Sequence, residues 1–268
     1  MYKFNYSNSF GDGLDTLRRM INTSSSVTFF GGAGVSTASG IPDFRSNPQT
    51  WEFDEKVYEL EDVLSDTFFY ADTANFYKIY RDLFIFDVKP NAVHRKLVEI
   101  DSPDRPVFVV TQNVDTLHSD AGTPSERLAT LHGTLETCHC TGCKTTYKSA
   151  DYIKKDDGYK IPLCPKCKSI LKPDIVLYGE KLDSSCLQSA FKWVSQANLL
   201  IVAGSSLSVA PACILIYDYL MAKRYRTNYK AVLINTGDVF PNYPCSEFLK
   251  SQFDLILPYD VNEVFKFL

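Results

Sequence analysis

Three features that mark whole classes of protein are missing from this sequence of 268 residues. It has no run of about 18 apolar residues, so no membrane-spanning helix is expected. It has no excess of basic residues, because its formal net charge is -4, and we therefore expect neither nucleic acid nor an anionic membrane as its main partner. Its first residues include no apolar segment of a secretory signal. We expect a cytoplasmic protein, or a nuclear one in a eukaryote.

Cysteine, by contrast, is abundant, since the chain has eight and four of them form two CxxC pairs. The pairs are Cys140-Thr-Gly-Cys143 and Cys164-Pro-Lys-Cys167, a spacing typical of tetrahedral zinc. Four thiolates leave no open coordination position, so this zinc is expected to be structural. Cys138 and His139 are left out of the set, because Cys138 is too close to Cys140 for the usual zinc knuckle. Three cysteines are interpreted as inert packing residues: Cys186, Cys213 and Cys245.

A glycine-rich turn follows the first apolar run of the chain. Residues 27–30 are β-branched or aromatic and predict a buried strand, which ends in Gly31-Gly-Ala-Gly34, and a helix is expected to start at Val35. A strand, a glycine turn and a helix start can bring backbone N–H groups to a phosphate, although many glycine turns are only tight turns. The segment Ile41-Pro-Asp-Phe-Arg45 then places an acid, an aromatic ring and a cation where a ribose could lie.

Polar residues follow a second apolar run, residues 106–111, which suits a parallel sheet covered on both faces. Because ligands gather beyond the carboxyl ends of such strands, we expect Gln112, Asn113 and Asp115 to converge on the glycine turn. The alternative is a hydrogen-bonded loop that caps the next helix. Further along, His132 precedes a glycine, and an imidazole is the side chain best suited to proton transfer near neutral pH.

Two later apolar runs also end in small or polar residues. Residues 199–203 end at Gly204-Ser-Ser206, and residues 231–234 end at Asn235. Residues 175–178 are expected to be extended as well. Strands that alternate with helices in this way predict an α/β fold with a doubly wound parallel sheet that binds a nucleotide.

Residues 51–86 are rich in aromatic and acidic side chains. The spacing of Phe69, Phe76, Tyr80 and Phe84 predicts helices rather than strands in this region. The simpler interpretation is an aromatic core for a small helical insertion. The alternative is an apolar channel that holds a long substrate side chain.

In combination, these motifs resemble the sirtuin family of NAD-dependent protein deacylases. The resemblance covers about residues 27–261, and the motifs come in the family's order and spacing: Gly32-Ala-Gly-Val-Ser36, Ser39-Gly-Ile-Pro-Asp-Phe-Arg45, Thr111-Gln-Asn-Val-Asp115, Leu131-His-Gly133, the two CxxC pairs, Lys172-Pro-Asp-Ile-Val-Leu-Tyr-Gly-Glu180, Gly204-Ser-Ser-Leu207 and Ile234-Asn235. It implies a Rossmann-like large domain formed by residues 1–46, 87–134 and 175–268. The rest would be a small helical insertion, residues 47–86, and a four-cysteine zinc-ribbon module, residues 135–174.

The resemblance also implies a role for each matched residue. Catalysis would depend on His132 and Asn113. The NAD-binding residues would be Gly32, Ala33, Gly34, Ile41, Asp43, Phe44, Arg45, Gln112, Asn113, Asp115, Gly204, Ser205, Ser206, Asn235 and Val261. The acyl-lysine would lie between Val176 and Tyr178, with its peptide paired as a strand to the backbone there. The zinc ligands would be Cys140, Cys143, Cys164 and Cys167.

The chemistry implied by the resemblance consumes NAD. His132 would act as general base on the ribose hydroxyls, and the products would be free lysine, nicotinamide and 2′-O-acyl-ADP-ribose. Three positions depart from the pattern of many members. Thr116 stands where a glycine is common, and Lys172 replaces an arginine. Tyr80 occupies the arginine position of desuccinylating members, with Arg81 one residue late, so we expect uncharged acyl groups, acetyl first.

Two other functions compete with protein deacylation. A protein mono-ADP-ribosyltransferase would use the same NAD site, and the sequence separates the two activities poorly. A zinc-ribbon interaction module with a degenerate nucleotide site would have lost the polar trio of Gln112, Asn113 and Asp115, or His132, and all four residues are present. We therefore expect an enzyme whose partners are acyl-lysine proteins or peptides.

Overall fold

Six parallel strands form the main sheet of the computed structural model, which describes residues 4–7, 9–43, 49–53, 55–85, 87–210, 212–241, 243 and 245–268. The strands lie side by side in the order β11-β10-β9-β1-β4-β5. Numbered along the chain, the six strands have the 3-2-1-4-5-6 order of a doubly wound, Rossmann-like sheet. Successive strands are added on one side of β1 up to β5 and then on its other side from β9 onward, so the strand order reverses between β1 and β9. The predicted fold class is therefore confirmed. The strands are β1 (Val27–Gly31), β4 (Val107–Thr111), β5 (Leu128–Thr130), β9 (Leu199–Ala203), β10 (Lys230–Ile234) and β11 (Leu255–Leu257).

Helices cover both faces of this sheet, as the nearly continuous apolar strands predict. Val27 and Phe29 of β1 face a core closed by α1 (Phe10–Thr23), α5 (Ala92–Glu99) and α11 (Val261–Phe267). Phe30 points to the opposite core, which is closed by α8 (Ser184–Gln196), α9 (Ala212–Lys223) and α10 (Ser246–Lys250). The residues that the structure describes form no helix that is long and apolar enough to cross a membrane.

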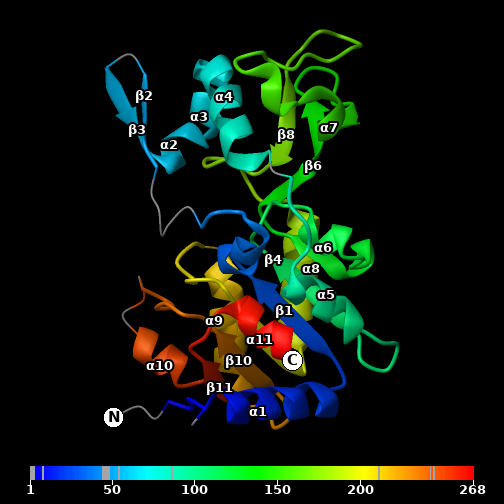
Figure 1. Ribbon diagram of the computed structural model, residues 1–268, viewed down its shortest axis with the longest axis vertical. Coiled ribbons are helices and arrows are strands. Elements are labelled where there is room, and N and C mark those ends of the chain that lie inside the picture. Colours follow the sequence, from blue (N-terminus) through cyan, green and yellow to red (C-terminus); the bar gives the residue numbers. More distant parts are fainter. Residues whose placement is uncertain are drawn as a thin grey trace.

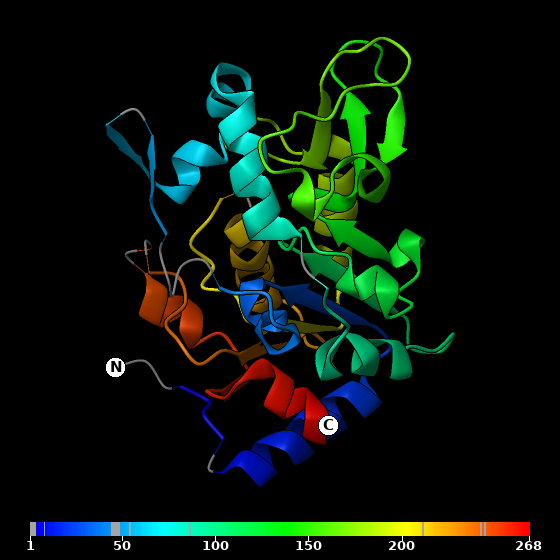
Figure 2. The ribbon, with the colours of Figure 1, turned by 45° about the horizontal axis from the view of Figure 1, so that its top comes forward.

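A second group of elements lies at the other end of the long axis of the molecule (Figure 1). It contains an antiparallel sheet in the order β7-β6-β8, a short helix that follows β7, and three helices beside the sheet. Figure 2 shows the helices on one side and the small sheet on the other, both above the main sheet. These elements are β6 (Gly133–Cys140), β7 (Thr146–Lys148), α7 (Ser149–Tyr152), β8 (Leu171–Ile175), α2 (Leu60–Val63), α3 (Asp66–Ala71) and α4 (Thr73–Phe84).

The helices α2–α4 and the small sheet share one aromatic core. Phe69, Phe76 and Tyr77 are fully buried in it, together with Cys140 and Cys164 from the predicted zinc ligands. The Tyr77 hydroxyl donates a hydrogen bond to the carbonyl of Leu171 in β8. The described aromatic side chains between residues 51 and 85, except the exposed Tyr70, therefore belong to a core or pack against it, as the simpler interpretation expects. This core joins two regions that the sequence suggested as separate insertions.

Two expectations about local structure are wrong. No α-helix starts at Val35, because two 3₁₀ turns, Ala33–Val35 and Thr37–Ser39, take its place. The Val35 carbonyl accepts a hydrogen bond from Asn91 Nδ2 at 2.7 Å, and the Ser39 N–H bonds to Ser36 three residues earlier, so the i to i−4 pattern of an α-helix is not formed.

The other concerns the start of the aromatic region, where β2 (Trp51–Phe53) and β3 (Lys56–Tyr58) pair as antiparallel strands instead of forming helix. Of residues 175–178, which are expected to be extended, Ile175 is the last residue of β8 and Tyr178 forms an isolated parallel bridge with Ser65. Pro173 is tolerated in β8 because this strand is at an edge of its sheet. The backbone beyond it bonds to two different elements, since the N–H of Val176 donates to His132 and that of Tyr178 donates to Leu64.

Candidate active site

A cleft of about 1010 Å³ lies between the carboxyl edge of the main sheet and the second group of elements. Its lining includes fifteen of the residues predicted to bind NAD or substrate or to catalyse: Ala33, Gly34, Ile41, Asp43, Gln112, Asn113, Asp115, His132, Val176, Tyr178, Gly204, Ser205, Ser206, Asn235 and Val261. Gly32 stands just before this lining and donates to the Ala203 carbonyl at 3.1 Å. Phe44 and Arg45 lie outside the described residues.

Two small-residue turns meet at the floor of the cleft. The parallel register sets Gly31 of β1 level with Ala203 of β9, so the turns that follow begin side by side. The Gly34 N–H donates to the Gly204 carbonyl at 2.9 Å. A Cβ on Gly34 would lie 2.8 Å from the Gly204 Cα, and Gly204 itself has φ +59. Glycine is therefore required at both positions, and the backbone of the two turns can approach a phosphate closely.

A buried serine organises the polar residues that follow β4. The Ser36 hydroxyl donates to Asp115 Oδ2 at 2.7 Å and accepts from Asn113 Nδ2 at 3.0 Å. Asp115 Oδ1 also accepts from the N–H of Leu117, the first residue of α6 (Leu117–Asp120). Asp115 thus lines the cleft and caps a helix start, so both interpretations of this loop hold.

The Asp115 carboxyl is held at an electrostatic cost. Burial raises its pKa, and the hydrogen bonds from Ser36, Leu117 and Asn113 oppose that shift only in part. Ser36 was missed as a site residue by the sequence reasoning. Its position in the glycine-rich motif was visible, but its partners lie 77 and 79 residues away along the chain.

Gln112 joins the first strand of the sheet to the second small-residue turn. Its N–H donates to the carbonyl of Gly31 at 2.9 Å, and its Oε1 accepts from the Ser205 hydroxyl at 2.6 Å. Its own carbonyl lies 2.8 Å from His132 Nδ1. Because a carbonyl oxygen only accepts, this contact places the imidazole proton on Nδ1 and the basic lone pair on Nε2.

The backbone after His132 is fixed by close packing against β8. Gly133 has φ +84, and a Cβ there would lie 2.0 Å from the Asp174 carbonyl oxygen. The His132 carbonyl accepts from the Val176 N–H at 2.8 Å. The imidazole is therefore positioned between the polar loop and residues 176–178, where a general base could act on groups bound in the cleft.

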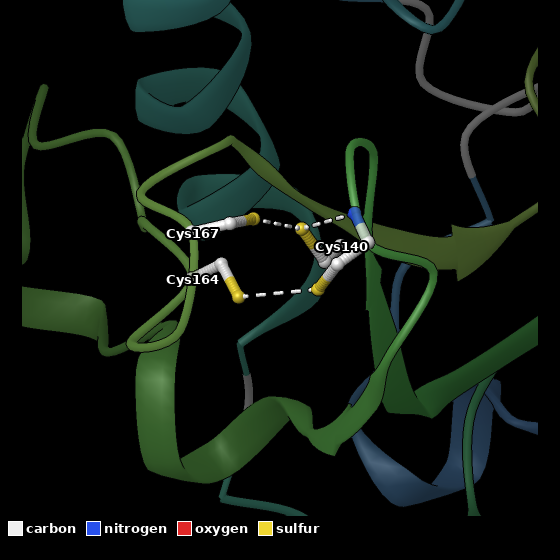
Figure 3. A group of neighbouring side chains, drawn as sticks. Cys140, Cys164 and Cys167 are labelled. Carbon is white, nitrogen blue, oxygen red and sulfur yellow. Dashed lines mark hydrogen bonds between the residues drawn. The ribbon is translucent and has the colours of Figure 1, made fainter.

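The four predicted zinc ligands come together away from the cleft. Their sulfur atoms all lie within 4.8 Å of one another, with Cys140 and Cys167 at 3.3 Å and Cys143 and Cys164 at 3.7 Å. Zn–S bonds of about 2.3 Å in a tetrahedron place sulfurs about 3.8 Å apart. In Figure 3 the sulfurs of Cys140, Cys164 and Cys167 face one another across the gap between two loops. The residues fit a zinc ion, which would fill all four positions of a closed structural site.

Comparison with known proteins gives a consistent result. The sequence model of the Sir2 family matches residues 32–211. An NAD-dependent protein deacetylase of Clostridium acetobutylicum is 42% identical over 226 residues, 84% of this chain and 88% of that protein. One of Staphylococcus aureus is 40% identical over 208 residues, 77% of this chain and 83% of that protein.

Solved structures of the same family superpose over most of the chain. Sir2Tm bound to a propionylated peptide has a TM-score of 0.76 at 32% identity, over 94% of this chain and 95% of that chain. A Sir2 complex with a p53 peptide and NAD+ has a TM-score of 0.75 at 32% identity, with the same coverage.

The four-cysteine site predicts that the protein is purified with one zinc ion per chain. The Cys143→Ser substitution should remove the ion and lower the free energy of unfolding by at least about 3 kcal/mol, because the loops around the metal bury little surface of their own. Atomic absorption and thermal unfolding measure both effects. Cys245→Ser, at a half-buried cysteine outside the cluster, is the control and should keep the zinc. Wild-type protein without zinc would contradict the assignment.

The raised pKa of Asp115 predicts that its charge destabilises the fold. A carboxyl whose pKa is higher in the folded than in the unfolded state loses stability as the pH rises through that range. Asp115→Asn should therefore raise the free energy of unfolding near pH 8 by roughly 0.5–1 kcal/mol and leave it almost unchanged near pH 3. Calorimetry at both pH values measures this, with the exposed Asp104→Asn as control. A less stable Asp115→Asn variant at pH 8 would refute the expected sign.

Proposed function

The chain belongs to the Sir2 family, and from that membership and the geometry of its cleft we propose that it is an NAD-dependent protein-lysine deacylase, with acetyl-lysine as its first substrate. One observation carries this proposal above all. A single cleft is lined by both glycine turns, by the Asn113–Asp115 loop, by His132 and by residues 176–178. Binding of a dinucleotide and of an acyl-lysine can therefore occur side by side, with an imidazole between them.

Different residues of the cleft would bind different parts of NAD. Ala33, Gly34, Ser205 and Ser206 would hold phosphates and ribose through backbone and hydroxyl groups, and Asn235 and Val261 would border the adenosine. Asn113 and Asp115, held by Ser36, would accept and donate hydrogen bonds at the nicotinamide amide. When bound, NAD supplies the electrophilic ribose carbon and nicotinamide as the leaving group.

His132 is the proton acceptor in this proposal. Its Nδ1 proton is held by the Gln112 carbonyl, so Nε2 is the nitrogen that takes a proton from a ribose hydroxyl. The peptide would add as an extended strand along residues 176–178, with the acyl-lysine side chain between Val176 and Tyr178. We also place the chain in a reducing compartment, such as the cytoplasm, because none of its eight cysteines, all within the described residues, forms a disulfide.

Loss of the base is the direct test of this assignment. His132→Ala should lower the rate of acetyl-lysine removal by about 10²–10⁴-fold, the usual contribution of a general base. His139→Gln is the matched control, since His139 pairs with Asp174 on the small sheet and does not line the cleft. Mass spectrometry of the wild-type products should detect 2′-O-acetyl-ADP-ribose and nicotinamide. Labelled NAD that leaves its ADP-ribose on a protein would instead identify a mono-ADP-ribosyltransferase.

The surroundings of Arg81 support a preference for uncharged acyl groups. Arg81 is 1% exposed, and its guanidinium donates to the carbonyls of Gly158 and Lys160. Tyr80, at the arginine position of desuccinylating members, is buried in the aromatic core. Among the described residues that line the cleft there is no lysine or arginine, whereas Leu60, Leu64 and Phe84 supply apolar surface. A carboxylate on the acyl group would find no cation among them.

Acyl selectivity can be measured with peptides that differ only in charge. Acetyl-lysine should be removed with a kcat/KM at least about tenfold higher than succinyl-lysine, because an unpaired carboxylate is costly to bury. Butyryl-lysine is the control, as it has the length of succinyl-lysine without its charge, and it should fall between the two. Faster removal of succinyl-lysine than of butyryl-lysine would overturn this preference.

A further inference from the structure

A buried lysine lies under the segment that leads from the small sheet into the cleft. Lys172 of β8 has a side chain that is only 4% exposed. Its Nζ donates to the carbonyls of Pro173 at 3.3 Å and Ile175 at 3.0 Å, and lies 2.9 Å from Glu180 Oε2. An ammonium has three protons, so these three contacts use its full donor capacity. A buried charge that is fully paired in this way holds its partners in one geometry.

Glu180, which Lys172 holds in place, also closes a tight turn. Its Oε2 accepts from the Leu177 N–H at 2.9 Å, and its own N–H donates to the Leu177 carbonyl, also at 2.9 Å. The two reciprocal hydrogen bonds close the turn formed by residues 177–180. Gly179 in the turn has φ +96, and a Cβ there would lie 2.6 Å from Asp66 Oδ1. The backbone of this segment is thus held by a side chain and by its packing.

The same segment contacts both sides of the cleft entrance. The Val176 N–H donates to His132, the Tyr178 N–H donates to Leu64 at 2.9 Å, and the Tyr178 carbonyl accepts from Asp66 at 3.0 Å. Glu180 lines the cleft, whereas Lys172 is not among the residues that do. Any effect of Lys172 on a bound peptide must therefore act through the carboxylate of Glu180 and the carbonyls that Lys172 holds.

We propose that Lys172 and Glu180 are a positioning pair that fixes residues 176–179 as a preformed edge for the acyl-lysine peptide. This inference rests on the proposed function, because it assigns the pair to the peptide side of the same cleft. A peptide that adds a strand to an ordered backbone does not have to order it, so its affinity is higher. The pair is therefore expected to contribute to the affinity for the peptide. Among the described residues, the hydrogen bonds of the pair go to Pro173, Ile175 and Leu177, and none goes to the two glycine turns that form the NAD side.

The decisive variants are Glu180→Ala and Lys172→Met. Each should raise the KM for an acetyl-lysine peptide roughly tenfold, the effect of losing one charge-assisted hydrogen bond, with kcat and the KM for NAD changed by less than about threefold. Glu180→Gln keeps an oxygen for the Leu177 N–H but loses the charge, and its effect should be smaller. The double variant should raise the KM by less than the product of the two single effects, because both substitutions remove the shared Lys172–Glu180 interaction.

A matched control residue lies at the amino-terminal ends of the strands of the main sheet, opposite the carboxyl ends that border the cleft. Asp254 is paired with Lys223 at 2.9 Å and accepts from the backbone N–H of Ala231 at 2.8 Å. Like Glu180, it is a carboxylate that binds a lysine and a backbone N–H, but it lies away from the cleft. Asp254→Ala should lower thermal stability and leave the peptide KM unchanged. Hydrogen exchange gives a readout without turnover: the Leu177 and Tyr178 amides should exchange faster in Glu180→Ala and not in Asp254→Ala.

The outcomes separate this inference from the proposed function. If wild-type protein removes acetyl groups but Glu180→Ala and Lys172→Met keep its peptide KM, the positioning pair is refuted while the deacylase stands. An equal rise of KM in Asp254→Ala would also refute it, since general destabilisation would then explain the effect. If wild-type protein removes no acyl group, the function fails, and fluorescence polarisation with a labelled acetyl-lysine peptide still tests the pair by its affinity.

Discussion

The contact between two glycine turns is the constraint on which the rest of the cleft depends. Because β1 and β9 are neighbours in parallel register, their carboxyl ends deliver Gly34 and Gly204 to the same place, where backbone meets backbone at 2.9 Å. A side chain on either residue would separate the turns. The Gln112–Ser205 hydrogen bond then fixes the next loop to the same floor, and the Gln112 carbonyl orients His132.

A second scaffold holds the substrate side of the cleft. The aromatic core of α2–α4 continues into the small sheet and reaches the cysteines, so one packed unit supports both the helices and the zinc loops. Arg81 reinforces this unit by bonding carbonyls at Gly158 and Lys160, which lie in a polar stretch with little core of its own. Residues 176–180 lie between the two scaffolds, because the Val176 N–H donates to His132 and the Tyr178 backbone bonds to Leu64 and Asp66. The position of the peptide edge is thus a property of both.

Stability and function make opposite demands on Asp115. Its carboxyl is buried enough for the pKa to rise, yet Ser36, Asn113 and Leu117 are arranged to keep it charged. Such arrangements are common where a charge is needed to bind or orient a ligand. The Lys172–Glu180 pair differs, because the opposite charges neutralise each other and the lysine uses all its donors.

The sequence by itself determined four strands of the main sheet with the turns that follow them, the four cysteines that come together and most residues that line the cleft. Strand ends, CxxC spacing and the His-Gly pair are local patterns. Tertiary contacts decided the rest. Val35 does not start a helix, since the side chain of Asn91, 56 residues away, donates a hydrogen bond to its carbonyl. β8 ends before Val176, since the next N–H groups bond to His132 and Leu64. The partners of Ser36 and the buried ammonium of Lys172 follow from packing between distant segments, where local propensity carries no information.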